Sequence, residues 1–518
     1  MIKSRIIIFF PMFIFLLTSL IVVNGLTPYG SATSPDSLSY LDMAANLKDG
    51  NGLLATDFSI PNSESRSLKE QRAWPPLYPA LLSTAVSNSY DVLTVSRIST
   101  ILLFISMFFV FIIVSSQNNW IIALVSSLLL SITIPIITIY TYVWSETLFI
   151  PLLIISTWVS IKYLELTNES NIYKSILLLI LLSILILLAY TRYIGIAFVL
   201  LLPVIYFMSN REKLDRVLFL IAASIYTLIV GYLLYGNYLA TGYISGTPRA
   251  DSDKTIVENL IDVYQVLIAI IPTSLIFILL SLIISIAIVY IIKKSHMVKI
   301  EKKNLRYQAI ILMLVAAIYL ISIVSLRTYS KFDMLDIRLL SPLFVILFVL
   351  ITILPSLFDI NSKRGTFVYM ISAFLIISFS IQGYNQFLVS LENWRKSGTP
   401  KHLLSHNLVY NNFTRNPDAN NEKKLFSNLI GASKGVIIID KPLIWGFITG
   451  IKCVQKPNLN YSGVLQKINA LPRGSLFILS KRQIDMFSEK IIGRNVAYKY
   501  MDIGEYIAIQ LPIDTSSQ

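Results

Sequence analysis

Long apolar runs separated by short polar loops fill the first three quarters of the chain. About eleven of these runs approach the length of about 20 residues that a helix needs to cross the hydrocarbon core of a bilayer. They cover approximately residues 6–23, 92–114, 120–139, 144–164, 175–190, 193–208, 217–235, 262–292, 307–326, 339–358 and 366–384. We therefore expect an all-α polytopic membrane protein with about eleven transmembrane helices.

The basic residues predict which side of the membrane each loop faces. The most basic loops, 210–216 and 293–306, fall on the same side as the N-terminus when the runs alternate across the bilayer. Because loops rich in lysine and arginine stay in the cytoplasm, we expect a cytoplasmic N-terminus. The polar segment 25–90 and everything after residue 385 should then lie outside.

The end of the chain has a different character. After residue 385 the sequence becomes polar, and short β-rich runs at 435–439, 475–479 and 506–511 alternate with stretches that favour helix. We predict two domains. Residues 1–384 form the transmembrane domain with its outer loop, and residues 385–518 form a small extracytoplasmic α/β domain.

Composition excludes several classes of protein. Of the 518 residues 55% are hydrophobic and only 14% are charged, against roughly 25% charged in soluble domains. The net charge of +14 would suggest nucleic acid as a partner of a soluble protein, but much of the lysine and arginine lies in short loops that orient the chain. We therefore expect the lipid bilayer, and no nucleic acid, as a partner.

The outer loop contains a predicted helix that begins near the end of the first apolar run. Ser34 is a typical N-cap and Pro35 a typical first helical residue, while Gly50 or Gly52 provides the stop. This spacing predicts about four turns lying along the membrane surface. Later in the loop, the proline-rich segment 74–79 predicts a stiff turn in which Trp74 and Tyr78 reach the membrane interface.

Two acidic residues on the outer side are candidates for chemistry. Asp36 lies in the first turn of the predicted helix, where the helix dipole stabilises an acid by about 0.3 to 1 kcal/mol, so capping alone could explain it. Glu146 precedes some eighteen largely apolar residues, where a carboxylate without a partner is costly. Its alternative interpretation is again an acid that caps a helix.

Arginines on the same side form a candidate phosphate-binding set. Arg192 interrupts more than thirty apolar residues, Arg338 opens the tenth run, and Arg249 lies in an outer loop. A guanidinium can bind a phosphate through two hydrogen bonds, although snorkelling to lipid headgroups is the alternative for Arg192. Arg97, inside the second run, is a weaker member that we expect to pair with an acid inside the bundle.

Six short segments follow one another in an order that resembles the GT-C superfamily of polytopic glycosyltransferases. The nearest resemblance is to the bacterial and archaeal relatives of protein O-mannosyltransferases and aminoarabinose transferases. The segments are Pro35-Asp36-Ser37-Leu38-Ser39-Tyr40, Gly50-Asn51-Gly52, Trp74-Pro75-Pro76-Leu77-Tyr78-Pro79, Trp144-Ser145-Glu146-Thr147-Leu148-Phe149, Thr191-Arg192-Tyr193-Ile194-Gly195 and Arg338-Leu339-Leu340-Ser341-Pro342.

The resemblance implies an inverting transferase that takes a sugar from a polyprenyl-phosphate-linked donor. Asp36 would be the general base, and Arg192 and Arg338 would bind the departing phosphate. The second acid of the family would be Glu146, with Asp42 as the alternative. The acceptor hydroxyl would belong to a lipid, a glycan or a protein, and neither a metal nor another cofactor is expected.

The resemblance also implies a place in the cell and further contact residues. The membrane would be the plasma membrane of a prokaryote, with the C-terminus outside. Tyr40, Trp74 and Tyr78 are the candidates for contact with the acceptor or the membrane interface.

Two alternatives remain from the sequence. A transporter or flippase of lipid-linked saccharides would use the same basic cavity without breaking a bond, although no internal repeat is evident. A structural or sensory membrane protein would need far fewer apolar runs for anchoring.

Overall fold

The computed structural model describes residues 2–28, 30–56, 68–87, 91–116, 120–165, 171–209, 213–294 and 302–397, together with five strands nearer the C-terminus. The chain divides into two compact units. The first comprises Met1–Ser31, Arg72–Leu81 and Leu93–Glu392, and the second comprises Ala32–Gln71, Leu82–Val92 and Asn393–Gln518.

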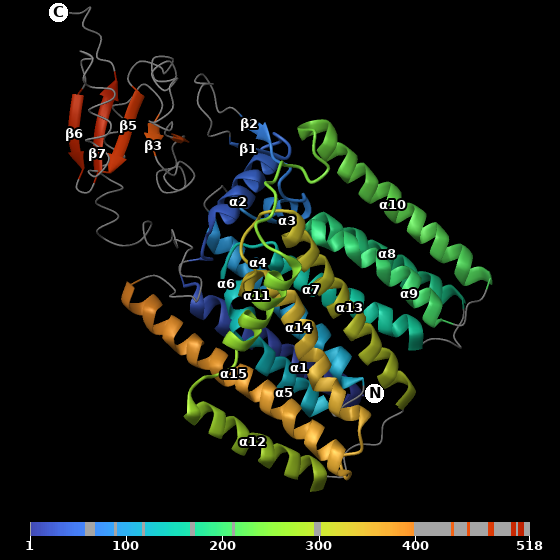
Figure 1. The fold of residues 1–518 in the computed structure, drawn as a ribbon. Helices are drawn as coiled ribbons and strands as arrows, with labels where there is room; N and C mark the ends of the chain where they lie inside the picture. The colour runs from blue at the N-terminus through green and yellow to red at the C-terminus, as the bar shows by residue number, and fades with distance from the viewer. Residues whose placement is uncertain are drawn as a thin grey trace, which may run out of the picture. The chain divides into compact units, whose positions relative to one another are not determined.

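Helices account for nearly all of the first unit (Figure 1). Their bounds are α1 (Ile2–Ser19), η1 (Leu20–Asn24), α3 (Leu77–Ser83), α4 (Val92–Ser115), α5 (Trp120–Ser131), α6 (Ile134–Thr141), α7 (Glu146–Glu165), α8 (Asn171–Thr191), η2 (Tyr193–Leu200), α9 (Leu201–Met208), α10 (Lys213–Thr241), α11 (Ile256–Ala269), α12 (Leu275–Lys294), α13 (Lys302–Tyr329), α14 (Ile337–Ile353), η3 (Leu354–Leu357) and α15 (Lys363–Ser397). Most of α7 and α14 is buried, so these two helices form the centre of the bundle.

The chain is a multi-pass membrane protein. Within the described residues, seven helices are long and apolar enough to cross a membrane, or up to eight if the bent pair α5 and α6 is one span. Three other predicted runs correspond to shorter apolar helices at Phe9–Asn24, Tyr193–Met208 and Leu275–Tyr290. The count of about eleven spans stays a prediction.

Two of the predicted runs are interrupted by residues outside any helix. The run 120–139 is divided into α5 and α6, which meet at an angle of 59°, and Pro135 stands in the first turn of α6. The run 262–292 is divided between α11 and α12, with Pro272 between them. Proline lacks an N–H and clashes with the preceding turn, which accounts for a break that apolarity alone does not reveal.

The helix α15 packs tightly against the break between α5 and α6. A Cβ atom added at Gly383 would lie 1.9 Å from the carbonyl oxygen of Ile132, and the Ser380 hydroxyl donates a 3.3 Å hydrogen bond to the Leu129 carbonyl. Small residues allow such close approach of backbones between membrane helices. The carbonyl groups near the break are thereby covered by α15.

The second unit contains the predicted outer-loop helix, α2 (Pro35–Lys48). Ser34 caps it in a capping box with Ser37, and Pro35 is its first residue, as predicted. At the other end Gly50 has a φ of +79°, and its N–H donates to the Leu47 carbonyl. This left-handed residue ends the helix at little cost because glycine has no side chain to clash.

Strands complete the second unit. The short strands β1 (Leu54–Thr56) and β2 (Leu68–Glu70) pair antiparallel. A five-stranded sheet has the order β4-β3-β5-β7-β6, in which β3 is parallel to β4 and β5 and the other pairs are antiparallel. Its strands are β3 (Ile437–Ile439), β4 (Cys453–Gln455), β5 (Ser475–Ser480), β6 (Lys499–Ile503) and β7 (Tyr506–Leu511). The predicted β-rich runs coincide with β3, β5 and β7, while the helices expected between strands lie outside the described residues.

The contact at Gly383 can be tested by substitution. Gly383→Ala should destabilise the protein by about 1 to 3 kcal/mol, because the added methyl group meets backbone that must move. In α10, Gly231 has no atom within 4 Å of the same position, and Gly231→Ala should be neutral or stabilise by about 0.5 to 1 kcal/mol. The unfolding temperature in detergent measures both; equal effects would contradict the tight packing of α15.

Candidate functional site

The carboxylate of Glu146 is the centre of the candidate site. Glu146 begins α7 and is fully buried. The turn before it is closed by the Thr147 hydroxyl, which donates a 2.7 Å hydrogen bond to the Trp144 carbonyl, and the Ser145 hydroxyl lies 3.4 Å from Glu146 Oε2. A buried carboxylate is stable only when cations or donors compensate for lost water.

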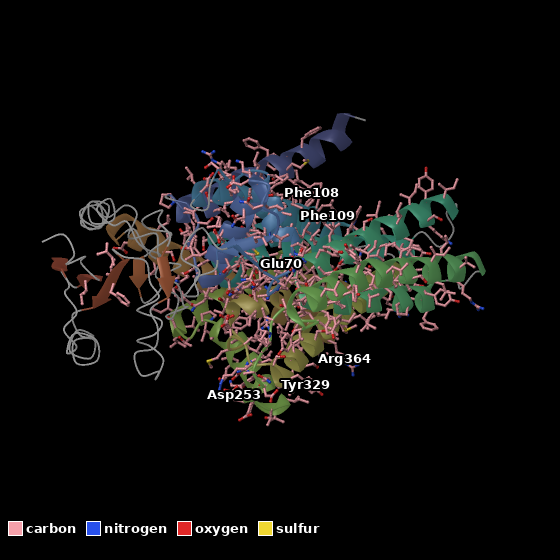
Figure 2. All side chains as sticks on the ribbon, turned by 90° about the horizontal axis from the view of Figure 1, so that it is seen from above. Glu70, Phe108, Phe109, Asp253, Tyr329 and Arg364 are labelled. Carbon is pink, nitrogen blue, oxygen red and sulfur yellow. The ribbon has the colours of Figure 1, made fainter. Side chains whose placement is uncertain are left out.

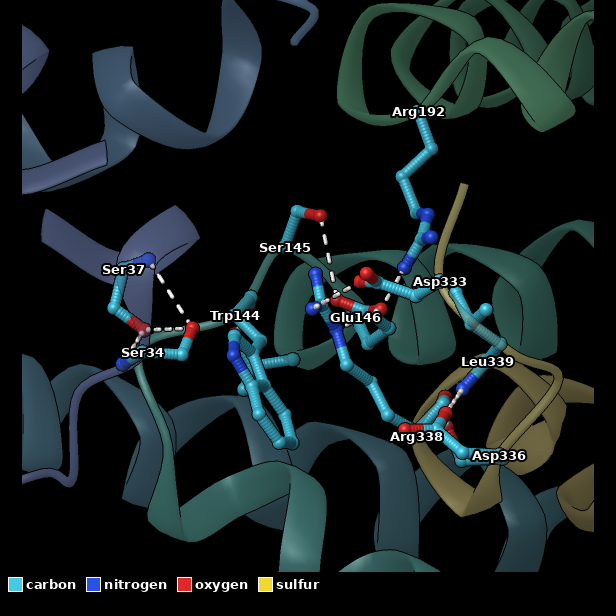
Figure 3. A network of polar contacts seen from close by, with 12 residues as sticks. Ser34, Ser37, Trp144, Ser145, Glu146, Arg192, Asp333, Asp336, Arg338 and Leu339 are labelled. Atoms are coloured by element: carbon cyan, nitrogen blue, oxygen red, sulfur yellow. Dashed lines mark hydrogen bonds and ion pairs between the residues drawn. The ribbon is translucent and has the colours of Figure 1, made fainter. Parts of the chain in front are cut away.

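Two arginines supply that compensation. Nε of Arg338 lies 2.9 Å from Glu146 Oε1, and the guanidinium of Arg192 forms an ion pair with the same oxygen (Figure 3). Arg192 has extended backbone between α8 and η2, and Arg338 is the second residue of α14. Side chains from three helix ends are thus brought together.

Aromatic rings support one of the guanidinium groups. The Arg338 guanidinium carbon lies 4.7 Å from the ring centre of Trp144. The Trp144 ring stacks on that of Tyr142, with 4.1 Å between the ring centres and an interplanar angle of 8°. A cation over an indole face is attracted by the ring quadrupole, more strongly when both are buried. Trp144, fully buried, therefore limits where the Arg338 side chain can lie.

The start of α14 carries two more acids. Asp336 caps the helix, its Oδ1 accepting a 2.9 Å hydrogen bond from the Leu339 N–H, and burial raises the pKa of its carboxyl to about 6. Asp333 lies with its Oδ2 3.8 Å from Arg338 Nη1, and its side chain is 74% exposed. Neither acid was predicted as a site residue from the sequence, although an aspartate just before an apolar run is an N-cap signal that could have revealed Asp336.

Tyr78 also lies close to this group. It is fully buried on α3; its pKa is raised by burial, partly offset by a hydrogen bond with Thr147, with a further increase from the charge of Glu146. Trp74 is half-buried in the turn that precedes α3. The predicted stiff turn is wrong for residues 77–79, which form the first turn of α3, where proline is tolerated because the N–H groups have no partner within the helix. We refer to Glu146, Arg192, Arg338, Trp144 and Tyr78 as the Glu146 cluster.

Two predicted phosphate-binding arginines lie elsewhere. Arg97 is exposed on α4, so the partner expected for it inside the bundle is not found among the described residues. Arg249 is exposed, and its guanidinium carbon lies 5.8 Å from the ring centre of Phe332. Among the contacts between described residues, neither side chain joins the Glu146 cluster.

Arg249 belongs instead to a second group of charges. Arg327, almost fully buried, lies 5.8 Å from the same Phe332 ring and donates a 3.1 Å hydrogen bond to Asp253. Lys331 reaches the other oxygen of Asp253 at 3.1 Å. Hydrogen bonds from Lys331 and Arg327 lower the pKa of the Asp253 carboxyl to about 2, and this side chain lies at the surface (Figure 2).

The remaining predicted residues are on α2. Asp36 lies in the first turn and is half-buried, Asp42 is half-buried further along, and Tyr40 is buried. The capping box fixes the backbone from which Asp36 projects. Within the described residues, no group of three or more histidine, cysteine, aspartate or glutamate side chains could hold a metal ion.

Comparison with known proteins reveals similarity in structure. No family model and no curated protein matches the sequence. The structure of ArnT from Cupriavidus metallidurans in the apo state superposes with a TM-score of 0.57 over 96% of this chain and 97% of that one, at 9% identity. The chain has the GT-C fold. The structure of the same ArnT bound to undecaprenyl phosphate gives a TM-score of 0.54 over 98% of each chain, at 8% identity, so the fold that the resemblance implied is confirmed.

Removing the central carboxylate should cost more than removing one of its partners. Glu146→Gln leaves two buried guanidinium groups without their carboxylate, a loss of about 3 to 5 kcal/mol. Arg192→Met keeps the pair between Glu146 and Arg338 and should cost less. Glu258→Gln, at an exposed position whose capping box accepts glutamine, is the control. Unfolding midpoints in detergent measure all three; a milder effect of Glu146→Gln than of Arg192→Met would contradict the shared ion pair.

The raised pKa of Asp336 predicts a pH dependence. Because the folded state disfavours the ionised carboxyl, wild-type stability should fall as the pH rises from about 4 towards 6 and then level off. Asp336→Asn keeps a good N-cap without the charge, so its stability relative to wild type should rise across that window. Unfolding midpoints at pH 4.5 and pH 7 measure this, with Asp251→Asn in an exposed loop as the control. A pH-independent difference between wild type and Asp336→Asn would contradict the buried carboxyl.

Proposed function

We propose that this protein is an integral-membrane glycosyltransferase that moves a sugar from a polyprenyl-phosphate-linked donor to an acceptor hydroxyl. The observation that carries the proposal is the convergence of Arg192 and Arg338 on the buried Glu146, within a chain of the GT-C fold. A solved structure with this fold, that of ArnT, was determined with undecaprenyl phosphate bound. A buried and a half-buried arginine beside membrane helix ends are suited to a lipid-linked phosphate.

The two arginines stabilise the leaving group. As the bond between the anomeric carbon and the phosphate oxygen breaks, negative charge accumulates on the departing polyprenyl phosphate. Guanidinium groups that are already oriented stabilise this charge without reorganisation during the reaction. Each guanidinium carries five N–H donors in a planar arrangement whose geometry matches phosphate.

Glu146 is a positioning residue in this mechanism. Its Oε1 accepts a hydrogen bond from Arg338 and forms an ion pair with Arg192, and a carboxylate stabilised in this way is a poor proton acceptor. Its contribution is to hold Arg192 and Arg338 at the orientation that a phosphate requires. Trp144 serves the same purpose from the face of the Arg338 guanidinium.

Asp36 is the general base of the proposed reaction. It takes the proton from the acceptor hydroxyl as the oxygen attacks the anomeric carbon, and the polyprenyl phosphate leaves from the opposite side, so the configuration inverts. The family pattern around Pro35-Asp36-Ser37 supports this assignment, as does the capping box that fixes the first turn of α2. Asp42, six residues further along α2, projects from another side of the helix and is the secondary candidate.

The topology predicted by the basic loops supports the side of the membrane on which the reaction occurs, and the family resemblance supports the kind of membrane. The proposed reaction takes place on the outer face of the plasma membrane of a prokaryote. The acceptor is a lipid, a glycan or a protein, with Tyr40 and Trp74 as candidate contacts.

A transfer assay tests this proposal. The full chain is reconstituted with a radiolabelled polyprenyl-phosphate sugar and a mixture of acceptors, and transfer of label is measured. Asp36→Asn should lower the rate by about 10²- to 10⁴-fold, the usual loss for a general base, while the control Asp251→Asn, which removes the same charge from an exposed loop, should retain full activity. Full activity of Asp36→Asn would remove it from the base role, and movement of intact donor across the bilayer without transfer would favour a flippase.

A further inference from the structure

One acidic contact of the Glu146 cluster has no part in the mechanism described above. Asp333 Oδ2 lies 3.8 Å from Nη1 of Arg338, while Nε of the same guanidinium binds Glu146 (Figure 3). The two carboxylates differ in their surroundings. Glu146 is fully buried, whereas the Asp333 side chain is 74% exposed.

The position of Asp333 is set by the segment on which it lies. The preceding Lys331 donates its backbone N–H to the Ala250 carbonyl at 2.8 Å and its side chain to Asp253. On the other side, Asp336 is fixed by its capping bond to Leu339. Contacts on both sides of Asp333 restrain the loop and keep its carboxylate near the guanidinium of Arg338.

The contact is weak enough for a ligand to displace it. A long ion pair with an exposed partner gains little in water, in contrast to the short buried bonds of Glu146. A lipid-linked phosphate that approaches from the solvent or headgroup side would compete with Asp333 for the Nη1 edge of Arg338. The bond to Glu146 would remain.

We infer that Asp333 is an internal competitor of the lipid phosphate at Arg338, which limits how tightly the donor and the released polyprenyl phosphate bind. The inference rests on the proposed function for the identity of the ligand, a phosphate carried on a polyprenyl chain. Its consequence is rapid product release: when the sugar has been transferred, the Asp333 carboxylate replaces the departing phosphate on Nη1. Asp333 acts on the ligand only through Arg338 and takes no part in the bond-breaking step.

Equilibrium binding tests this role. The full chain in lipid nanodiscs is titrated with radiolabelled polyprenyl phosphate, without acceptor or sugar. Asp333→Asn should lower the Kd by about two- to fivefold, the range expected when an exposed ion pair is removed. Asp333→Glu, which keeps the charge, should bind like wild type or more weakly.

The matched control is Asp251→Asn, which removes the same charge from an exposed loop position. It should leave the Kd unchanged. An unchanged or higher Kd for Asp333→Asn, or an equal decrease for Asp251→Asn, would overturn the inference. Transfer activity is measured in parallel: tighter binding by Asp333→Asn in a protein that transfers no sugar would uphold the inference while removing the proposed function.

Discussion

The sharing of one buried carboxylate by two guanidinium groups constrains how the first unit can be built. Glu146 has no access to water, so the chain must bring Arg192 and Arg338 to it or leave an uncompensated charge. This requirement joins the start of α7, the break after α8 and the start of α14. Three segments that are far apart in the sequence are thereby held at one point.

The helix ends at the start of α7 and of α14 favour an anion near the Glu146 cluster. The positive end of the α7 dipole favours the Glu146 carboxylate, whereas the corresponding end of α14 disfavours the Arg338 cation. Glu146, Asp336 and the Trp144 ring offset this repulsion around α14. The arginine is thus held where it would otherwise be unstable, and a phosphate bound there would gain from both the cation and the helix end.

The charged residues of the candidate site were easier to predict from the sequence than the contacts that surround them. Glu146, Arg192 and Arg338 were recognisable because charge inside long apolar runs is costly and needs a purpose. Arg249 has the same chemistry but lies against Phe332, since the fold of a loop decides which cation faces which group. Asp333 resembles any other loop acid in the sequence, because only the tertiary structure brings it to Arg338.

In the fold, too, local features were predictable from the sequence and tertiary contacts were not. Ser34, Pro35 and Gly50 bound α2 through local interactions that a sequence displays. The close packing of α15 against the break between α5 and α6 is a tertiary contact that a sequence does not display. The helices expected between the strands near the C-terminus stay a prediction, as do the role of Asp36 and the side of the membrane on which it acts.

The most direct test of the central claim is an experimental structure of the protein with polyprenyl phosphate bound. We expect the phosphate oxygens within hydrogen-bonding distance of the guanidinium groups of both Arg192 and Arg338, with Glu146 still bound to them. A phosphate held by other residues, with the two arginines bound only to Glu146, would contradict the account.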